Sequence, residues 1–299
     1  MNPDTKNLIA AASLSMLVLI GWQMYFVEPE LEAQRDAYNE AQTNAELPNA
    51  SSTAAQTDKT AILDAPERPA DDARRIMIET PLLSGSLTTK GARIDDLTLT
   101  TYRETLDDDA ANITLLRKIS DSSPYFAEFG WIAENSDQPL PDAKTIWQAD
   151  GDMLTPDSDI TLRWDNGAGL TFIRTLGIDD KYMMTISDSV ASNSDDIIRL
   201  LPYGLVRRFG TPEVSGIYIL HEGPVGVVDK TLKERSYDDV QDEREDFTSE
   251  EAGGWIGITD KYWLTALIPQ QTSLANYSMR ALAGPEIRYQ TDYLGEAMV

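Results

Sequence analysis

Few residues of this sequence could carry out chemistry. His221 is the single histidine in a chain of 299 residues that contains no cysteine. Thiol catalysis, disulfides, cysteine-based zinc sites and sites built from several histidines are therefore excluded. An imidazole beside a carboxylate can act as a general base, and Glu222 follows His221. Neighbouring residues of a strand point to opposite faces, however. The sequence therefore predicts a histidine at the edge of a turn, not a His–Glu dyad.

Paired carboxylates are the other candidates, because they can bind calcium or share acid–base work. None lies in an EF-hand pattern, and a chain with 50 Asp and Glu residues contains such pairs by chance. No P-loop or G-x-S-x-G motif is present, and Gly167-Ala168-Gly169 lacks the third glycine of a dinucleotide-binding loop. We therefore assign no catalytic, cofactor-binding or metal-binding residue, expect no cofactor and predict that the chain is not an enzyme. The pairs are Asp107-Asp108, Asp179-Asp180 and Asp238-Asp239.

Charge and composition indicate which kinds of partner the chain can bind. The chain has 25 Lys and Arg against 50 Asp and Glu, which gives a net charge of −25. Such a surface repels phosphate backbones, and the sequence has no concentrated basic patch, so we expect no nucleic-acid partner. The hydrophobic fraction of 41% is enough for a packed core.

Period-2 alternation of apolar and polar residues predicts the folded part of the chain. It begins near residue 75, and no long helical period follows. In the clearest hairpin, Asn166-Gly167 supplies the positive φ angles of a tight turn. The pattern predicts an all-β domain of two packed sheets. The expected strands are Leu82–Thr89, Ile94–Tyr102, Ile160–Trp164, Leu170–Arg174 and a strand containing Tyr182, Met184 and Ile186.

Residues 229–251 interrupt this alternation with ten acidic and four basic side chains. Few apolar positions lie among them. We predict a solvated loop or a polar helix, with a partner-docking surface as the alternative.

Residues 1–27 are predicted to be a transmembrane anchor. Residues 7–27 carry no charge, and as a helix they would span roughly 30 Å, the thickness of the hydrocarbon core. Lys6 precedes this run and Glu28 follows it, so the positive-inside bias places the N-terminus in the cytoplasm. A cleaved signal peptide is the alternative, but the run is longer than a typical h-region and no A-x-A site follows. Residues 28–75, acidic and punctuated by prolines, are predicted to form a flexible linker to a domain at 76–299.

Residues 253–269 hold the most distinctive local pattern. Gly257 would permit close backbone approach or a bulge, and Pro269 would end the strand pairing. Trp255 belongs either to the core, which we expect, or to a cleft for a glycan or an extended peptide. If it is core, replacing it with alanine should cost roughly 3–5 kcal/mol.

This segment resembles the strand pair that ends the periplasmic domain of YidC-type membrane protein insertases. There, a Gly-Gly-Trp is followed by a Tyr-aromatic pair and a terminal Ile-Pro, as in Gly253–Pro269. Three other stretches agree with the family in order. Residues 1–27 resemble its first transmembrane helix, Thr88–Ile94 its opening strand turn, and Tyr218–Gly226 a stretch in the second half of the domain.

The resemblance implies a twisted β-supersandwich of the galactose-mutarotase type, in the periplasm and anchored in the bacterial inner membrane. It implies a protein that helps integral membrane proteins insert and fold, alone or with the Sec translocon. The lipid bilayer, translocon components and nascent membrane proteins would be its partners. The family's insertase core, five further transmembrane helices, is not in this sequence. The chain thus resembles an N-terminal part that ends at or just before the last strands of the periplasmic domain. The alternative is a single-pass, membrane-anchored periplasmic protein that binds or processes carbohydrate.

Overall fold

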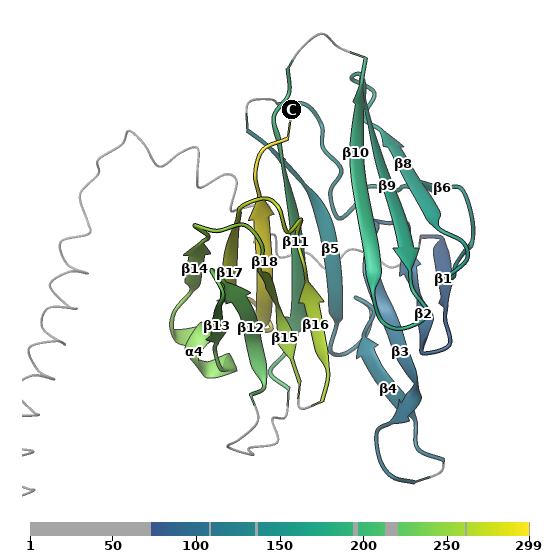
Figure 1. Cartoon of the computed structure of the whole chain (residues 1–299). Coiled ribbons are helices and arrows are strands. Elements are labelled where there is room, and N and C mark those ends of the chain that lie inside the picture. The colour runs from purple at the N-terminus through teal and green to yellow at the C-terminus, as the bar shows by residue number, and fades with distance from the viewer. Residues whose placement is uncertain are drawn as a thin grey trace, which may run out of the picture. The chain divides into compact units, whose positions relative to one another are not determined.

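The computed structural model describes residues 73–107, 109–134, 137–193, 197–212, 221–260 and 262–298 (Figure 1). The predicted anchor, residues 1–27, and nearly all of the predicted linker lie outside these ranges. Among the described residues, no helix has both the length and the hydropathy of a membrane span.

A ten-stranded sheet forms one layer of the fold. Its neighbours pair antiparallel, except for one short parallel pair at the edge. In spatial order the strands are β14 (Glu245–Thr248), β17 (Ala275–Leu282), β18 (Arg288–Gly295), β11 (Leu200–Phe209), β5 (Tyr125–Ala133), β3 (Ile94–Arg103), β2 (Leu83–Thr88), β1 (Arg75–Glu79) and β7 (Met153–Leu154), with β4 (Asn112–Leu116) paired beside β3.

Two four-stranded sheets form the second layer, and both lie in front of the large sheet in Figure 1. The first, sheet I, consists of β10 (Met184–Ser192), β9 (Leu170–Ile178), β8 (Ile160–Asp165) and β6 (Gln148–Ala149). The second, sheet II, consists of β13 (Thr231–Glu234), β12 (Gly223–Val228), β15 (Trp255–Thr259) and β16 (Leu264–Leu267). A short helix, α4 (Tyr237–Asp242), follows β13.

One apolar core joins the three sheets. Along β9, buried and half-buried residues alternate strictly, so every second side chain points at the large sheet. Phe172 of β9, Ile256 of β15 and Val206 of β11 are all fully buried in this cluster. The predicted all-β sandwich is confirmed, with one difference: the second layer is split into two sheets.

Most of the predicted strands are present. The hairpin of β8 and β9 pairs Asp165 with Thr171 around Gly167, whose φ is 70°. The strand expected to include Tyr182 begins only at Met184, because Asp179 Oδ1 accepts bonds from the main-chain N–H groups of Lys181 and Met183 and closes a turn there. Residues 229–251 contain the predicted polar helix as α4, but they also form β13 and β14.

Candidate functional site

His221 lies where the sequence predicts, at the turn that enters β12. Its Nε2 is 2.9 Å from the carbonyl oxygen of Pro224. A carbonyl only accepts, so Nε2 carries the proton in this contact. The ring is thereby engaged in holding the local turn.

The acidic pairs also have local roles. Asp179 closes the turn before β10. Asp239 and Ser236 form a capping box at the start of α4, and the Ser236 main-chain N–H holds the pKa of the Asp239 carboxyl below its ordinary value. Asp107 accepts a bond from Thr105 Oγ1 at 3.0 Å, while Asp108 lies outside the described residues. Within the described ranges, no three His, Asp or Glu side chains are grouped to hold a metal ion.

A groove of about 460 Å³ lies between sheet I and sheet II. Its floor is the large sheet, with Leu97 and Leu99 of β3, Leu116 of β4 and Phe129 of β5. This volume lies within the range of roughly 300–1,000 Å³ that ligand sites occupy. Its other lining residues come from β16 and from the start of β10. Figure 1 shows these two strands in front of the large sheet.

Edge strands form both walls of the groove. β10 is the edge of sheet I, and Met183, Met184 and Ile186 at its start line one wall. β16 is the edge of sheet II and lines the other wall along its full length, together with Tyr262 and Trp263 before it. The exposed fractions of Tyr262 and Met183 are 70% and 53%, so large apolar surface meets solvent at the mouth.

The lining has an unusual composition for this protein. Every described side chain that lines the groove is uncharged, although the chain as a whole carries a net charge of −25. Contiguous exposed apolar surface of this kind marks a site for a protein segment, a membrane or another apolar ligand.

Arg174 fixes the sheet I wall to the floor. Its guanidinium is fully buried and binds Asp188 of β10 through two contacts, at 2.7 and 2.8 Å, and the Phe129 carbonyl oxygen at 3.0 Å. The same group lies over the rings of Trp131 and Trp147, 5.1 and 5.5 Å from their centroids. Cation–π contacts and paired hydrogen bonds together make this interior position tolerable for a charge.

A second arginine and a glycine set the sheet II wall. Arg208 on the large sheet pairs with Asp260, at the turn between β15 and β16, and lies 5.2 Å from the Tyr125 ring centroid. At Gly257, a Cβ atom would stand 2.1 Å from the Thr265 carbonyl oxygen. The predicted close approach at Gly257 is therefore confirmed, and it draws β16 tightly against β15.

The burial of Trp255 differs from the prediction. The sequence predicts that it belongs to the core, but its side chain is only partly buried, whereas Ile256 and Ile258 beside it are fully buried. Alternation along β15 turns the isoleucines and the tryptophan to different sides. The residues of this segment that line the groove come later, at Tyr262 to Leu267, and their association with Met183 and Ile186 had no local signal.

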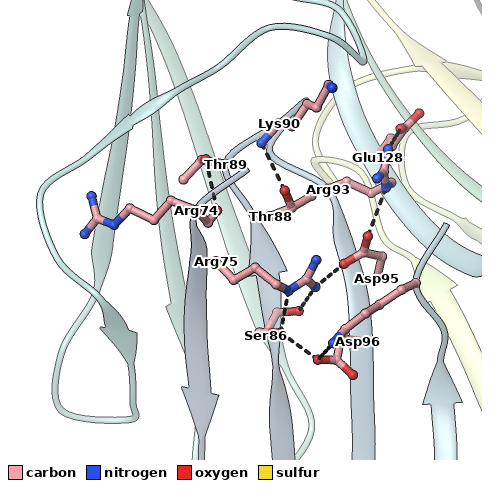
Figure 2. A network of polar contacts seen from close by, with 11 residues as sticks. Arg74, Arg75, Ser86, Thr88, Thr89, Lys90, Arg93, Asp95, Asp96 and Glu128 are labelled. Carbon is pink, nitrogen blue, oxygen red and sulfur yellow. Dashed lines mark hydrogen bonds and ion pairs between the residues drawn. The ribbon is translucent and has the colours of Figure 1, made fainter. Parts of the chain in front are cut away.

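The opposite face of the large sheet carries a network of polar contacts (Figure 2). Asp95 is the extra residue of a bulge, because Ser86 pairs with Asp96 and Leu87 with Ile94. It binds Arg75 at 2.5 Å and Arg93 at 3.2 Å, and Arg93 continues to Glu128 at 3.4 Å. These contacts connect β1, β3 and β5. Since each charge faces an opposite charge, we interpret the network as structural.

Comparison with known proteins identifies the family of this chain. A sequence model described as the YidC periplasmic domain matches residues 75–299. "Membrane protein insertase YidC" of Methylobacterium nodulans is 41% identical over 99% of this chain and 52% of its own length. The proteins of the same name from Methylorubrum extorquens and Rickettsia bellii are 39% and 36% identical over 100% of this chain and 53% of their own lengths.

The chain therefore spans about half the length of these curated relatives. Among solved structures, a galactose mutarotase related enzyme from Lactobacillus acidophilus aligns with 75% of this chain and 97% of its own, with a TM-score of 0.41 and 8% identity. The relatives are bacterial and are named as insertases. The match over residues 75–299 and these identities show that the chain belongs to the family of YidC membrane protein insertases.

Proposed function

We propose that this chain is the N-terminal portion of a membrane protein insertase and chaperone, and that its groove binds apolar segments of membrane proteins. The groove between β10 and β16, whose described side chains are all uncharged, supports this proposal. A segment destined for a bilayer is apolar, and outside the bilayer it gains free energy by burying its side chains against an apolar lining. The relatives' name supplies the client class, integral membrane proteins.

The proposal includes a location. Residues 1–27 anchor the chain in the bacterial inner membrane with the N-terminus in the cytoplasm, residues 28–75 form the linker, and residues 76–299 lie in the periplasm. The family description of the matched domain as periplasmic supports this arrangement. The full chain should remain in the membrane fraction after carbonate extraction, and a soluble product that begins near Glu28 would contradict the anchor.

Partners and chemistry follow the same reasoning. We propose that the chain works alone or beside the Sec translocon, touches the bilayer and nascent membrane proteins, and binds them without covalent chemistry or a cofactor. A carbohydrate-binding role is not favoured, because the described lining of the groove offers sugar hydroxyls no charged group and few side-chain hydrogen-bonding groups.

The groove can be tested with two charge insertions. Met183→Glu and Leu264→Glu place a carboxylate on either wall at side chains that are 53% and 46% exposed, so both variants should fold. Binding of a fluorescent apolar peptide to the full chain in nanodiscs should weaken in each. Leu232→Glu, at a 55% exposed residue of β13 that does not line the groove, is the matched control. Equal binding by all three variants would contradict the proposal.

A further inference from the structure

The main chain of β16 supports an inference about how the groove binds its client, and this inference rests on the proposed function. β16 pairs with β15 on one side and, within the described residues, has no strand on its other side. That open edge forms a wall of the groove. A strand edge exposes a row of main-chain donors and acceptors that another strand can join.

The register shows which groups are open. Asp260 N–H donates to the Trp263 carbonyl oxygen at 2.8 Å, so residues 260 and 263 are a hydrogen-bonded pair. Bonded and non-bonded pairs alternate along an antiparallel ladder. Thr265 and Leu267 therefore bond to β15, while the main-chain groups of Leu264 and Ala266 point away from it, toward the groove.

β16 is a short edge strand, but it lacks the charges, prolines and bulges that protect other edges. Its sequence, Leu264-Thr265-Ala266-Leu267, contains no charge and no proline, and its register with β15 has no bulge. Natural edges are usually blocked by at least one of these devices. Leu264 and Ala266 are also exposed to solvent.

We propose that the groove binds a client segment in extended form, as an added strand that pairs with the open edge of β16. Main-chain bonds to Leu264 and Ala266 would hold it, as in other cases of strand addition. Every second side chain would point to the floor of Leu97, Leu99 and Phe129, and the others to solvent. The site would therefore select segments with apolar residues at alternate positions, without regard to exact sequence.

The test uses a variant that removes one main-chain donor. Ala266→Pro deletes an N–H that faces the groove and leaves the bonds to β15 in place, a position where edge strands accept proline. Ala266→Thr keeps the N–H and suits a strand, so it is the matched control. The probe is a dye-labelled nine-residue peptide of alternating valine and threonine with lysine ends, titrated into the full chain in nanodiscs and followed by fluorescence anisotropy.

We expect Ala266→Pro to raise the Kd at least about fivefold, the effect of one net hydrogen bond together with the bulk of the ring. Ala266→Thr should leave the Kd unchanged. If Ala266→Pro fails to fold, the wild-type chain is titrated with the same peptide N-methylated at every amide, which should not bind. Equal binding of the methylated peptide would overturn strand addition.

The outcomes separate this inference from the proposed function. If Leu264→Glu weakens binding but Ala266→Pro and N-methylation do not, the groove binds apolar segments without strand pairing, and only the present inference fails. If neither kind of change matters, both fail. A dimer of the wild-type chain that Ala266→Pro converts to a monomer, and that the peptide does not dissociate, would assign the edge to a second copy and also overturn the inference.

Discussion

Arg174 stabilises the fold because its buried charge is fully paired. It occupies an inward position of β9, is fully buried, and holds Asp188 and the Phe129 carbonyl. Loss of one partner from a buried pair leaves an uncompensated charge in a low-dielectric interior. The pair therefore supports the wall of the groove as long as both members are present.

Replacing Asp188 with alanine should lower the free energy of unfolding by about 3–5 kcal/mol, because Arg174 then stays buried without its counter-charge. Urea denaturation of the full chain measures this. The double variant Arg174→Met/Asp188→Ala should be less destabilised than the single one. Lys230→Met, which breaks the exposed pair with Glu251, should leave the midpoint unchanged. A single variant as stable as wild type would show that the pair does not hold the layers together.

Ile258 and Trp255 offer a matched comparison on β15. Ile258 is 1% exposed, and its replacement by alanine should cost about 2–5 kcal/mol. Trp255 is only partly buried, so Trp255→Ala should cost less than Ile258→Ala, contrary to what the sequence alone predicts. Thermal unfolding of the two variants decides the order, and a larger loss for Trp255 would restore the core assignment.

The sequence predicts the roles of some residues and not of others. The turn at His221 and the close approach at Gly257 follow from local chemistry, and both are present. Burial of Arg174 could not be expected, because the partners that offset its charge come from β5 and β10. Met183 had no local signal of a site, since its role depends on β16, far along the chain.

At the scale of elements, α4 shows how charge fixes a short helix. Ser236 Oγ accepts from Asp239 N–H at 3.1 Å, and the Asp239 carboxylate accepts from Ser236 N–H at 2.9 Å. The helix also packs Tyr237 and Val240 into the core. The acidic segment that contains it is therefore part of the fold, not only a solvated connection.

The stability that Asp239 contributes should depend on pH. Its pKa is lowered in the folded chain by the Ser236 main-chain N–H. The contribution is then complete above the ordinary value of 3.8 and is lost as the pH falls through the lower folded-state pKa. Asp239→Asn should be less stable than wild type at pH 7, and the difference should shrink below pH 4. Chemical denaturation at several pH values measures it; a difference that is constant with pH would contradict this origin.

Elements were predictable where their pairing is local. The β8–β9 hairpin and the strands on either side of Lys90-Gly91 depend on turn residues that the sequence displays. β10 begins at Met184, two residues later than alternation predicts, because Asp179 extends the turn through side-chain bonds that alternation does not reveal.

For the whole molecule, sheet order lies beyond what the sequence reveals. β11 pairs with β5 and with β18, which are distant along the chain, and sheets I and II come from separate stretches of it. Non-local pairing of this kind has no periodic signature. Two packed sheets were expected, and the division of the second layer creates the groove.

Site-specific photocrosslinking in cells tests the central claim that this groove receives membrane protein clients. A photoreactive amino acid at Leu264 on the groove wall is compared with one at Leu232, which is similarly exposed on β13 and does not line the groove. The experiment is done in bacteria that synthesise a radiolabelled integral membrane protein. We expect crosslinks to the nascent membrane protein from Leu264 and none from Leu232. Equal crosslinking from both positions, or none from Leu264, would contradict it.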